Sequence, residues 1–416
     1  SSLSSAERYQ AVANIILAHT EAGDCVVVSA AGKTTNTLVT LWQSYQQGDQ
    51  QAVSDILLQL DNHQRTLIEQ LLSPAARHTA LNVLEQELAL IAQQTQQQSL
   101  QEAALLAHGE VWSARLLASY LKQLNVAAQD VDARQLFTLN DGQLLHQKNQ
   151  QACAELISAN CINIVTGFIA ADCQANTVTL GRNGSDYSAT LLSSYCHASQ
   201  VSIWTDTQGV FSTDPRKVKK AIKYSKVCRG QANLLARLGN PVLHAKTLSP
   251  LKNTDIKLVV RSSYDSEASA TEIVKEGYSK AKRFITTLEN IDLLRIDQLR
   301  GGEIGELSQL IQHSLHHFIK NGDTYLLVPA AATHQVVSHL QGRANIIESN
   351  LHGCAVVAPR NDVAQLFEQA TQVLSEQSFC LLYNSDAADD RPYVDLVDPL
   401  ITTNKHKCDT ASVPDT

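Results

Sequence analysis

The chain has 416 residues, of which 44% are hydrophobic and 18% charged, a balance that allows two or three folded domains. Its formal net charge of −8 argues against nucleic acid or an anionic membrane surface as the main partner. The sequence contains no apolar run long enough to span a bilayer and no secretory signal, so we expect a cytoplasmic protein. The nine cysteines are irregularly spaced without a Cys-x-x-Cys pair, which favours reduced thiols over a metal site.

The first hundred residues predict one strand among helices. Apolar residues recur at helical spacing over residues 4–18, behind serines suited to cap a helix. The β-branched run at residues 25–28 predicts a buried parallel strand, with residues 33–36 in the loop that follows it. Residues 40–107 are rich in Gln and Leu and poor in glycine, which predicts a helical insertion covering the sheet.

Further strands and helices alternate up to about residue 260. Glu110 is expected in the first turn of a helix over residues 111–124, where a carboxylate usually faces the helix dipole. Apolar and β-branched runs predict strands at residues 125–131, 162–169 and 177–180. This alternation implies an α/β fold with a mostly parallel sheet between helices.

Gly181 and Gly184 lie in a loop before the next helical pattern. Ser185 or Asp186 is expected to cap that helix, and Arg182 adds a forked cation suited to a carboxylate or phosphate. A glycine loop that leads into a helix favours anion binding, because unpaired N–H groups and the helix dipole point the same way. An ordinary strand–turn–helix junction remains the alternative for the glycines alone.

A second strand end with polar residues follows within about 25 residues of this loop. The run at 201–205 predicts a buried strand, and Asp206 begins a polar loop that closes with Thr213–Arg216. In open parallel sheets, ligands bind beyond the carboxyl ends of the strands. The two strand ends therefore predict a nucleotide and a small acidic substrate bound side by side.

The last strand of this domain is expected at residues 256–260, after a helix at 234–248 that is interrupted at 239–241. From about residue 279 the pattern changes to a β–α–β–β–α–β rhythm. The expected strands there are residues 284–290, 291–299, 324–329, 344–358, 379–383 and 393–397. The expected helices are residues 303–319, 334–340 and 362–376.

Six stretches together resemble the motifs of aspartate kinases, members of the amino-acid kinase superfamily. The stretches are Val27–Asn36, His108–Ser113, Leu180–Tyr187, Trp204–Asp206, Thr213–Arg216 and Pro241–His244. The residues of these stretches are most similar to the kinase portion of bifunctional aspartokinase–homoserine dehydrogenases. The resemblance implies an amino-acid-kinase fold over residues 1–278, α+β ACT-like regulatory domains over 279–404 and a tail over 405–416. It also implies a homodimer formed through the ACT-like domains and the possibility of an amino-acid effector.

The reaction implied by the resemblance is transfer of the ATP γ-phosphoryl group to the β-carboxylate of L-aspartate. The product is 4-phospho-L-aspartate, and the step begins lysine, threonine and methionine biosynthesis. The cofactors are ATP and the Mg²⁺ that ATP carries, with no metal held by the protein itself. Because a carboxylate nucleophile is already ionised at neutral pH, the site needs positioning groups and cations rather than a general base.

The resemblance also assigns roles to individual residues. Arg182 is expected to clamp an aspartate carboxylate, and the residues completing that substrate pocket are Thr35, Glu110 and Ser185. Asp186 is expected to organise the cationic groups around the transferring phosphoryl, so that Asp186 and Arg182 are the catalytic pair. The nucleotide-binding residues are expected to be Ser29, Thr205, Asp206, Phe211 and Arg216.

Three departures from the family pattern keep a second hypothesis open. The Lys-Phe-Gly-Gly sequence of the family is not among the 416 residues, Phe211 replaces a frequent Tyr, and Pro241 replaces a frequent Lys. The alternative is a catalytically silent module that senses an amino acid. A relative acting on glutamate or acetylglutamate fits the His-Gly-Glu and Thr-Asp-Pro-Arg motifs less well.

Overall fold

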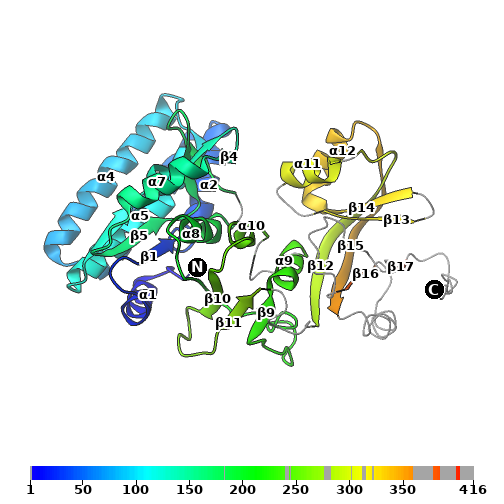
Figure 1. The fold of residues 1–416 in the computed structure, drawn as a ribbon. Helices are drawn as coiled ribbons and strands as arrows, with labels where there is room; N and C mark the ends of the chain where they lie inside the picture. Colours follow the sequence, from blue (N-terminus) through cyan, green and yellow to red (C-terminus); the bar gives the residue numbers. More distant parts are fainter. Residues whose placement is uncertain are drawn as a thin grey trace. The chain divides into compact units, whose positions relative to one another are not determined.

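The computed structural model describes residues 2–181, 183–238, 243, 245–275, 283–300, 302–311, 315–320, 323–358, 378–384 and 400–402 (Figure 1). The chain divides into two compact units. The first comprises Ser1–Gly209 and Lys246–Glu272, and the second comprises Val210–Ala245 and Ile273–Thr416. The predicted domain boundary at residue 278, the tail from residue 405, and the expected elements at 362–376 and 393–397 lie outside the described residues.

Three parallel strands form the centre of the first unit, in the order β1 (Cys25–Val28), β5 (Ile162–Thr166) and β2 (Ala128–Val131). All five residues of β5 are buried, as expected for a strand covered on both faces. Ile164 and Val165 point to opposite sides and belong to different hydrophobic clusters, because side chains alternate along a strand. This arrangement confirms the predicted α/β architecture.

A second parallel pair joins β8 (Gln200–Thr205) to β10 (Lys257–Ser262), with Thr205 opposite Ser262. Helix α8 (Gly184–Tyr195) leads into β8. A small sheet lies beside them in the order β4-β3-β6-β7. Its strands are β3 (Thr138–Asn140), β4 (Gln143–Leu144), β6 (Ile169–Asp172) and β7 (Thr177–Thr179).

Long helices make up the predicted insertion, and Figure 1 shows α4 and α5 as extended rods in this part of the chain. They are α2 (Thr34–Gln46), α3 (Gln50–Leu71), α4 (Pro74–Gln96) and α5 (Glu102–Gln123). Pro74 starts α4, where a missing N–H costs nothing. Buried leucines of α2, α3 and α5 pack in one cluster with Ile162 and Ile164 of the central strand. The insertion therefore covers one face of the sheet, as predicted.

The shorter elements complete both units. Helix α1 is capped by Ser5, whose hydroxyl accepts from the Arg8 N–H at 3.4 Å. The shorter elements are α1 (Ala6–His19), α6 (Ala133–Leu136), α7 (His146–Leu156), β9 (Lys226–Cys228), α9 (Arg229–Arg237), α10 (Ala245–Leu248), η1 (Ser249–Leu251) and β11 (Thr271–Val274). None of the described helices is both long enough and apolar enough to cross a membrane.

The second unit contains a six-stranded sheet in the order β13-β14-β12-β15-β16-β17. The strands are β12 (Phe284–Ile296), β13 (His316–Lys320), β14 (Asp323–Pro329), β15 (Ala344–Ala358), β16 (Ser378–Asn384) and β17 (Leu400–Thr402). The helical elements packed with them are α11 (Glu303–Leu310), η2 (Ala330–Ala332) and α12 (Thr333–His339). This is the predicted α+β arrangement, with a core made by strand residues such as Leu294 and Leu326 and helix residues such as Leu307 and Val336.

Four element boundaries were predicted wrongly. The strands expected at 284–290 and 291–299 form the single strand β12, whose register with β15 shifts around Asn290 (φ 55°) rather than breaking. The helix expected over 303–319 ends at Leu310, and His316–Lys320 pairs with β14 instead. The strand expected over 162–169 ends at Thr166, because the chain turns at Phe168 (φ 66°), where the Ile169 N–H donates to the Gly167 carbonyl at 2.7 Å, before β6 begins. The loop expected at 33–36 is the start of α2.

A buried carboxylate organises the second unit. Asp292 is 6% exposed and accepts from the Thr333 hydroxyl at 2.6 Å and from the Asn350 N–H at 3.0 Å. We expect Asp292→Ala to lower the free energy of unfolding of this unit by about 2–3 kcal/mol, because both donors lose their partner. Hydrogen exchange of residues 284–296 measures the change. Asp297→Ala, at a half-exposed carboxylate, is the matched control, and equal effects of the two substitutions would contradict the assignment.

Candidate active site

The carboxyl ends of the three central strands define one edge of the sheet. The Gly167 N–H, just after β5, donates to the carbonyl of Val28 at the end of β1 at 2.8 Å. The Thr166 hydroxyl accepts from the Ala133 N–H at the start of α6 at 2.7 Å. Ser29, the first residue after β1, is exposed at this edge. These hydrogen bonds join the ends of β1 and β5 and the start of α6, and they involve none of the predicted site residues.

Glu110 lies near the middle of α5 and not in a first helical turn, so that prediction was wrong. The Ala- and Leu-rich residues 102–107 favour a helix and Gly109 does not interrupt it, so α5 extends back to Glu102. The Glu110 side chain is 3% exposed, and its Oε1 accepts from the Ala30 N–H at 3.4 Å. Its Oε2 is buried without a hydrogen-bond partner among the described residues. Desolvation by burial raises the pKa of Glu110 to about 7.

Gly109 allows α5 to approach the loop after β1 this closely. A Cβ at Gly109 would lie 2.8 Å from the Cβ of Ala30, which is inside normal contact distance. The next turn of the loop is also held: the Thr34 hydroxyl donates to the Ala31 carbonyl at 2.6 Å and accepts from the Gln64 amide at 3.3 Å. Thr35 follows, half-buried in the first turn of α2. Glu110 and Thr35 therefore belong to one braced substructure.

The N-terminus of α8 carries two further predicted residues. Asn183, with φ 50°, occupies the N-cap position in the left-handed region that Asn tolerates. Ser185 and Asp186 lie inside the first turn, so the prediction that one of them caps the helix was wrong. Both are half-buried, and burial raises the pKa of Asp186 to about 6. Arg182, the predicted clamp and catalytic partner, lies outside the described residues.

Gly167 brings this helix end against the edge of the central sheet. A Cβ at Gly167 would lie 2.6 Å from the Cβ of Ser185, and one at Gly184 would lie 2.7 Å from the Phe168 ring. The Ser188 hydroxyl accepts from the Phe168 N–H at 3.0 Å and donates to the Gly184 carbonyl at 2.9 Å. Ser185 thus lies directly beside the turn after β5, and its role in a substrate pocket stays a prediction.

Lys246 lies beside the glycine loop, a contact that the sequence analysis did not predict. Its ammonium donates to the Leu180 carbonyl at 2.7 Å and lies 4.8 Å from the centre of the Tyr187 ring. Burial lowers its pKa. The contact fixes the residue that precedes the glycine loop. The only available signal was a cation close to the Pro241–His244 motif, and sequence spacing does not indicate which loop such a cation reaches.

The predicted nucleotide residues fall in both units. In the first, the Thr205 hydroxyl donates to the Asp206 carboxylate at 3.1 Å, and the Thr205 carbonyl accepts from the Ser263 hydroxyl at 3.1 Å. In the second, Phe211 forms an isolated β-bridge with Lys223, and Arg216 pairs with Asp214 at 3.0 Å. The structure therefore brings Thr205 and Asp206 together, while a shared pocket with Phe211 and Arg216 stays a prediction.

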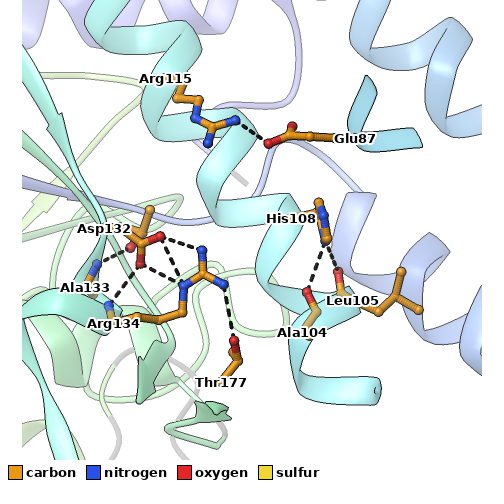
Figure 2. A network of polar contacts seen from close by, with 10 residues as sticks. Glu87, Ala104, Leu105, His108, Arg115, Asp132, Ala133, Arg134 and Thr177 are labelled. Carbon is orange, nitrogen blue, oxygen red and sulfur yellow. Dashed lines mark hydrogen bonds and ion pairs between the residues drawn. The ribbon is translucent and has the colours of Figure 1, made fainter. Parts of the chain in front are cut away.

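His108 has a structural environment. Figure 2 shows its ring directed at the carbonyls of its own helix, Ala104 at 3.0 Å and Leu105 at 3.2 Å from Nδ1. Burial lowers its pKa, so the ring is neutral at pH 7. The same figure shows Arg134 bonded to Asp132, the residue that caps α6 after β2. Within the described part of the chain, no group of three or more His, Cys, Asp or Glu side chains is arranged to hold a metal ion.

Comparison with known proteins gives consistent matches. The model of the amino acid kinase family matches residues 1–262. The chain is 35% identical over 304 residues to bifunctional aspartokinase/homoserine dehydrogenase 2 of Escherichia coli (strain K12), covering 71% of this chain and 37% of that protein. It is 33% identical over 255 residues to lysine-sensitive aspartokinase 3 of the same organism, covering 59% of this chain and 56% of that protein. The match thus spans 37% of the length of the first relative and 56% of the second.

Solved structures match over most of the chain. The structure of E. coli aspartokinase III in complex with aspartate and ADP has a TM-score of 0.74 at 26% identity, covering 88% of this chain and 86% of that one. The same enzyme in complex with lysine and aspartate, in its T-state, has a TM-score of 0.68 at 27% identity, covering 86% and 85%.

The raised pKa of Glu110 predicts a specific pH dependence of stability. Folded Glu110 keeps its proton up to about pH 7, whereas the unfolded chain releases it near the ordinary value of 4.5. Between these values the folded state binds more protons, so raising the pH lowers the free energy of unfolding, by up to about 3 kcal/mol. Glu110→Gln removes the titrating proton, and we expect it to flatten this fall.

Urea unfolding between pH 4.5 and 7.5 measures the effect, followed by tryptophan fluorescence. All three tryptophans (Trp42, Trp112 and Trp204) lie in the first unit and report its unfolding. Glu155→Gln, at an exposed carboxylate, should leave the pH profile unchanged. Identical profiles for the wild-type chain and Glu110→Gln would contradict the prediction.

The close packing of Gly109 against Ala30 can be tested by substitution. Alanine normally favours a helix interior over glycine by about 1 kcal/mol. At Gly109 we expect the reverse, a loss of about 1–3 kcal/mol, because the new methyl group overlaps the Cβ of Ala30. Thermal unfolding measures it. The control is Gly305→Ala, at an exposed helical glycine with no atom within 4 Å of the new Cβ, and it should be neutral or stabilising.

Proposed function

The chain belongs to the amino acid kinase family, and from this premise we propose that it is an aspartate kinase, which transfers the γ-phosphoryl group of MgATP to the β-carboxylate of L-aspartate. The observation that carries the proposal is the match to an aspartokinase bound to aspartate and ADP over 88% of this chain. Ser29, Glu110 and Ser185, which come from three of the matching motifs, lie near the carboxyl ends of β1 and β5.

Glu110 suits the ammonium group of the substrate. Its Oε2 is buried and has no hydrogen-bond partner among the described residues, and a bound cation next to it restores the charged carboxylate that burial disfavours. Ser185 and Thr35 lie on the two helices that face this edge and supply hydroxyl donors to the substrate carboxylates. Arg182, which precedes α8 in the sequence, supplies the cation for one of those carboxylates.

The phosphoryl group moves between two anionic groups, so the protein must offset negative charge and align the reacting atoms. The N-terminus of α8 directs its backbone N–H groups and its dipole toward this edge. Asp186 orients the cationic groups, while Ser29, Thr205, Asp206, Phe211 and Arg216 hold the nucleotide. Mg²⁺ would arrive with ATP and would offset the negative charge of its phosphates. No residue acts as general base, because the attacking β-carboxylate is already ionised.

The second unit is proposed to regulate the first. Its α+β sheet follows the kinase region in the chain, and the T-state structure of E. coli aspartokinase III, which matches 86% of this chain, contains lysine. We propose that an amino acid binds the ACT-like sheet and that two chains associate through it.

An aspartyl-hydroxamate assay with MgATP and L-aspartate tests the function. Arg182→Ala should raise the aspartate KM at least about thirtyfold, the effect of losing about 2 kcal/mol from a charged hydrogen-bonded pair. The KM for ATP should stay the same. Arg65→Ala removes a half-exposed guanidinium paired with Asp61 on α3 and is the matched control.

An unchanged aspartate KM in Arg182→Ala would overturn the assignment of the clamp. A folded wild-type chain that binds aspartate without phosphorylating it would instead support the silent sensing module.

A further inference from the structure

A cavity of about 570 Å³ lies between α3, α4 and α5 in the first unit. None of the residues assigned above to substrate or nucleotide lines it. Its floor is apolar and buried: Ile68 is 7% exposed, Leu84 3%, Trp112 6% and Leu116 5%. The volume falls within the range of small-molecule sites, about 300–1,000 Å³.

The rim of the cavity is polar. Glu87 accepts from the indole N–H of Trp112 at 2.7 Å and pairs with Arg115 at 2.5 Å, the ion pair drawn in Figure 2. The negative charge of Glu87 is therefore already engaged, while the Arg115 side chain remains 42% exposed with further N–H donors. Lys122 adds an exposed ammonium group and Asp130 an exposed carboxylate.

We propose that this cavity is a binding site for a small amphipathic anion, with an apolar body on the Trp112–Leu116 floor and an acidic group at Arg115 and Lys122. The four charged groups at the rim sum to zero, so the preference comes from hydrogen bonding: Arg115 keeps further N–H donors beside its pair with Glu87, and Lys122 adds an ammonium, so a ligand group that only accepts hydrogen bonds fits better than a cation. Asp130 weakens binding by repulsion, and a neutral ligand gains only the apolar contact.

The site is separate from the catalytic edge but shares two helices with it. Gln64 of α3 lines the cavity, and its amide donates to the Thr34 hydroxyl in the loop-bracing contact. Arg115 lies five residues beyond Glu110 on α5, about 140° around the helix. A ligand in the cavity thus contacts the same helices that hold the loop after β1, without touching the reacting groups.

A matched pair of fluorescent probes tests the site on the full chain. 8-Anilinonaphthalene-1-sulfonate carries the sulfonate, and N-phenyl-1-naphthylamine has the same rings without the charge. We expect one sulfonate probe per chain, bound more tightly than the neutral probe and not displaced by MgATP. Lys122→Met should weaken sulfonate binding about three- to fivefold, because a partly exposed charge pair contributes about that factor to an affinity. Asp130→Asn should strengthen sulfonate binding by a similar factor, because it removes a repulsive charge. Lys148→Met, at an exposed lysine on α7, is the matched control.

Filling the cavity should abolish binding of both probes. Ala80→Trp places a ring over the floor, and Val83→Trp does the same from a position that is 37% exposed and so tolerates a larger side chain. Circular dichroism verifies that the variants fold. Sulfonate binding retained in both folded variants, or displaced by MgATP, overturns the site. Equal affinity for the two probes, or no opposite response of Lys122→Met and Asp130→Asn, overturns the anion assignment.

Discussion

Two close approaches of helices to strand ends hold the candidate site together. Gly109 lets α5 pack against Ala30 after β1, and Gly167 lets the first turn of α8 pack beside the end of β5. The Gly167 N–H also bonds the Val28 carbonyl, so both strand ends share one anchor. Any side chain at either glycine would push a helix away from the sheet edge. The positions of Glu110 and Ser185 follow from these contacts, because each is adjacent to or opposite one of the glycines.

Burial at this edge produces two carboxyl groups with raised pKa values, Glu110 and Asp186. Among the described residues no side-chain cation lowers either value, so desolvation prevails. A buried carboxyl group of this kind lowers the free energy of unfolding unless a ligand of opposite charge binds beside it. The stability lost at Glu110 above its ordinary pKa is therefore consistent with a site built to receive an ammonium group.

Much of this arrangement could be predicted from the sequence because its strands are short β-branched runs and its insertion is rich in Gln and Leu with little glycine. Residues 25–28 and 201–205 contained the signals for β1 and β8, whereas the strand expected over 162–169 stops early at the left-handed Phe168, a conformation that its residue type does not signal. Glu110 was expected at a helix start because the apolar run begins at Val111, whereas the Ala- and Leu-rich residues upstream extend the helix back to Glu102. The α8 cap was misassigned because Asn183 adopts a left-handed conformation that residue type permits but does not dictate.

Other features depend on contacts between distant segments and had no local signal. The Lys246 contact with the Leu180 carbonyl joins residues 66 apart in the chain, and the Gln64 contact with Thr34 joins residues 30 apart. His316–Lys320 continues an apolar pattern that also fits a helix, and only its pairing with β14 makes it a strand.

The chain passes between the two units three times, at Gly209/Val210, Ala245/Lys246 and Glu272/Ile273. The two units are therefore not consecutive domains joined by a single linker. A fragment that stopped after residue 272 would keep residues 210–245 but lose the rest of the unit to which they belong. The segment with the Thr-Asp-Pro-Arg motif would then lack the residues it packs against. Recombination at a single point after the kinase region would therefore not transfer a complete folding unit. A kinase region that folds alone would need other residues to pack against the segment 210–245.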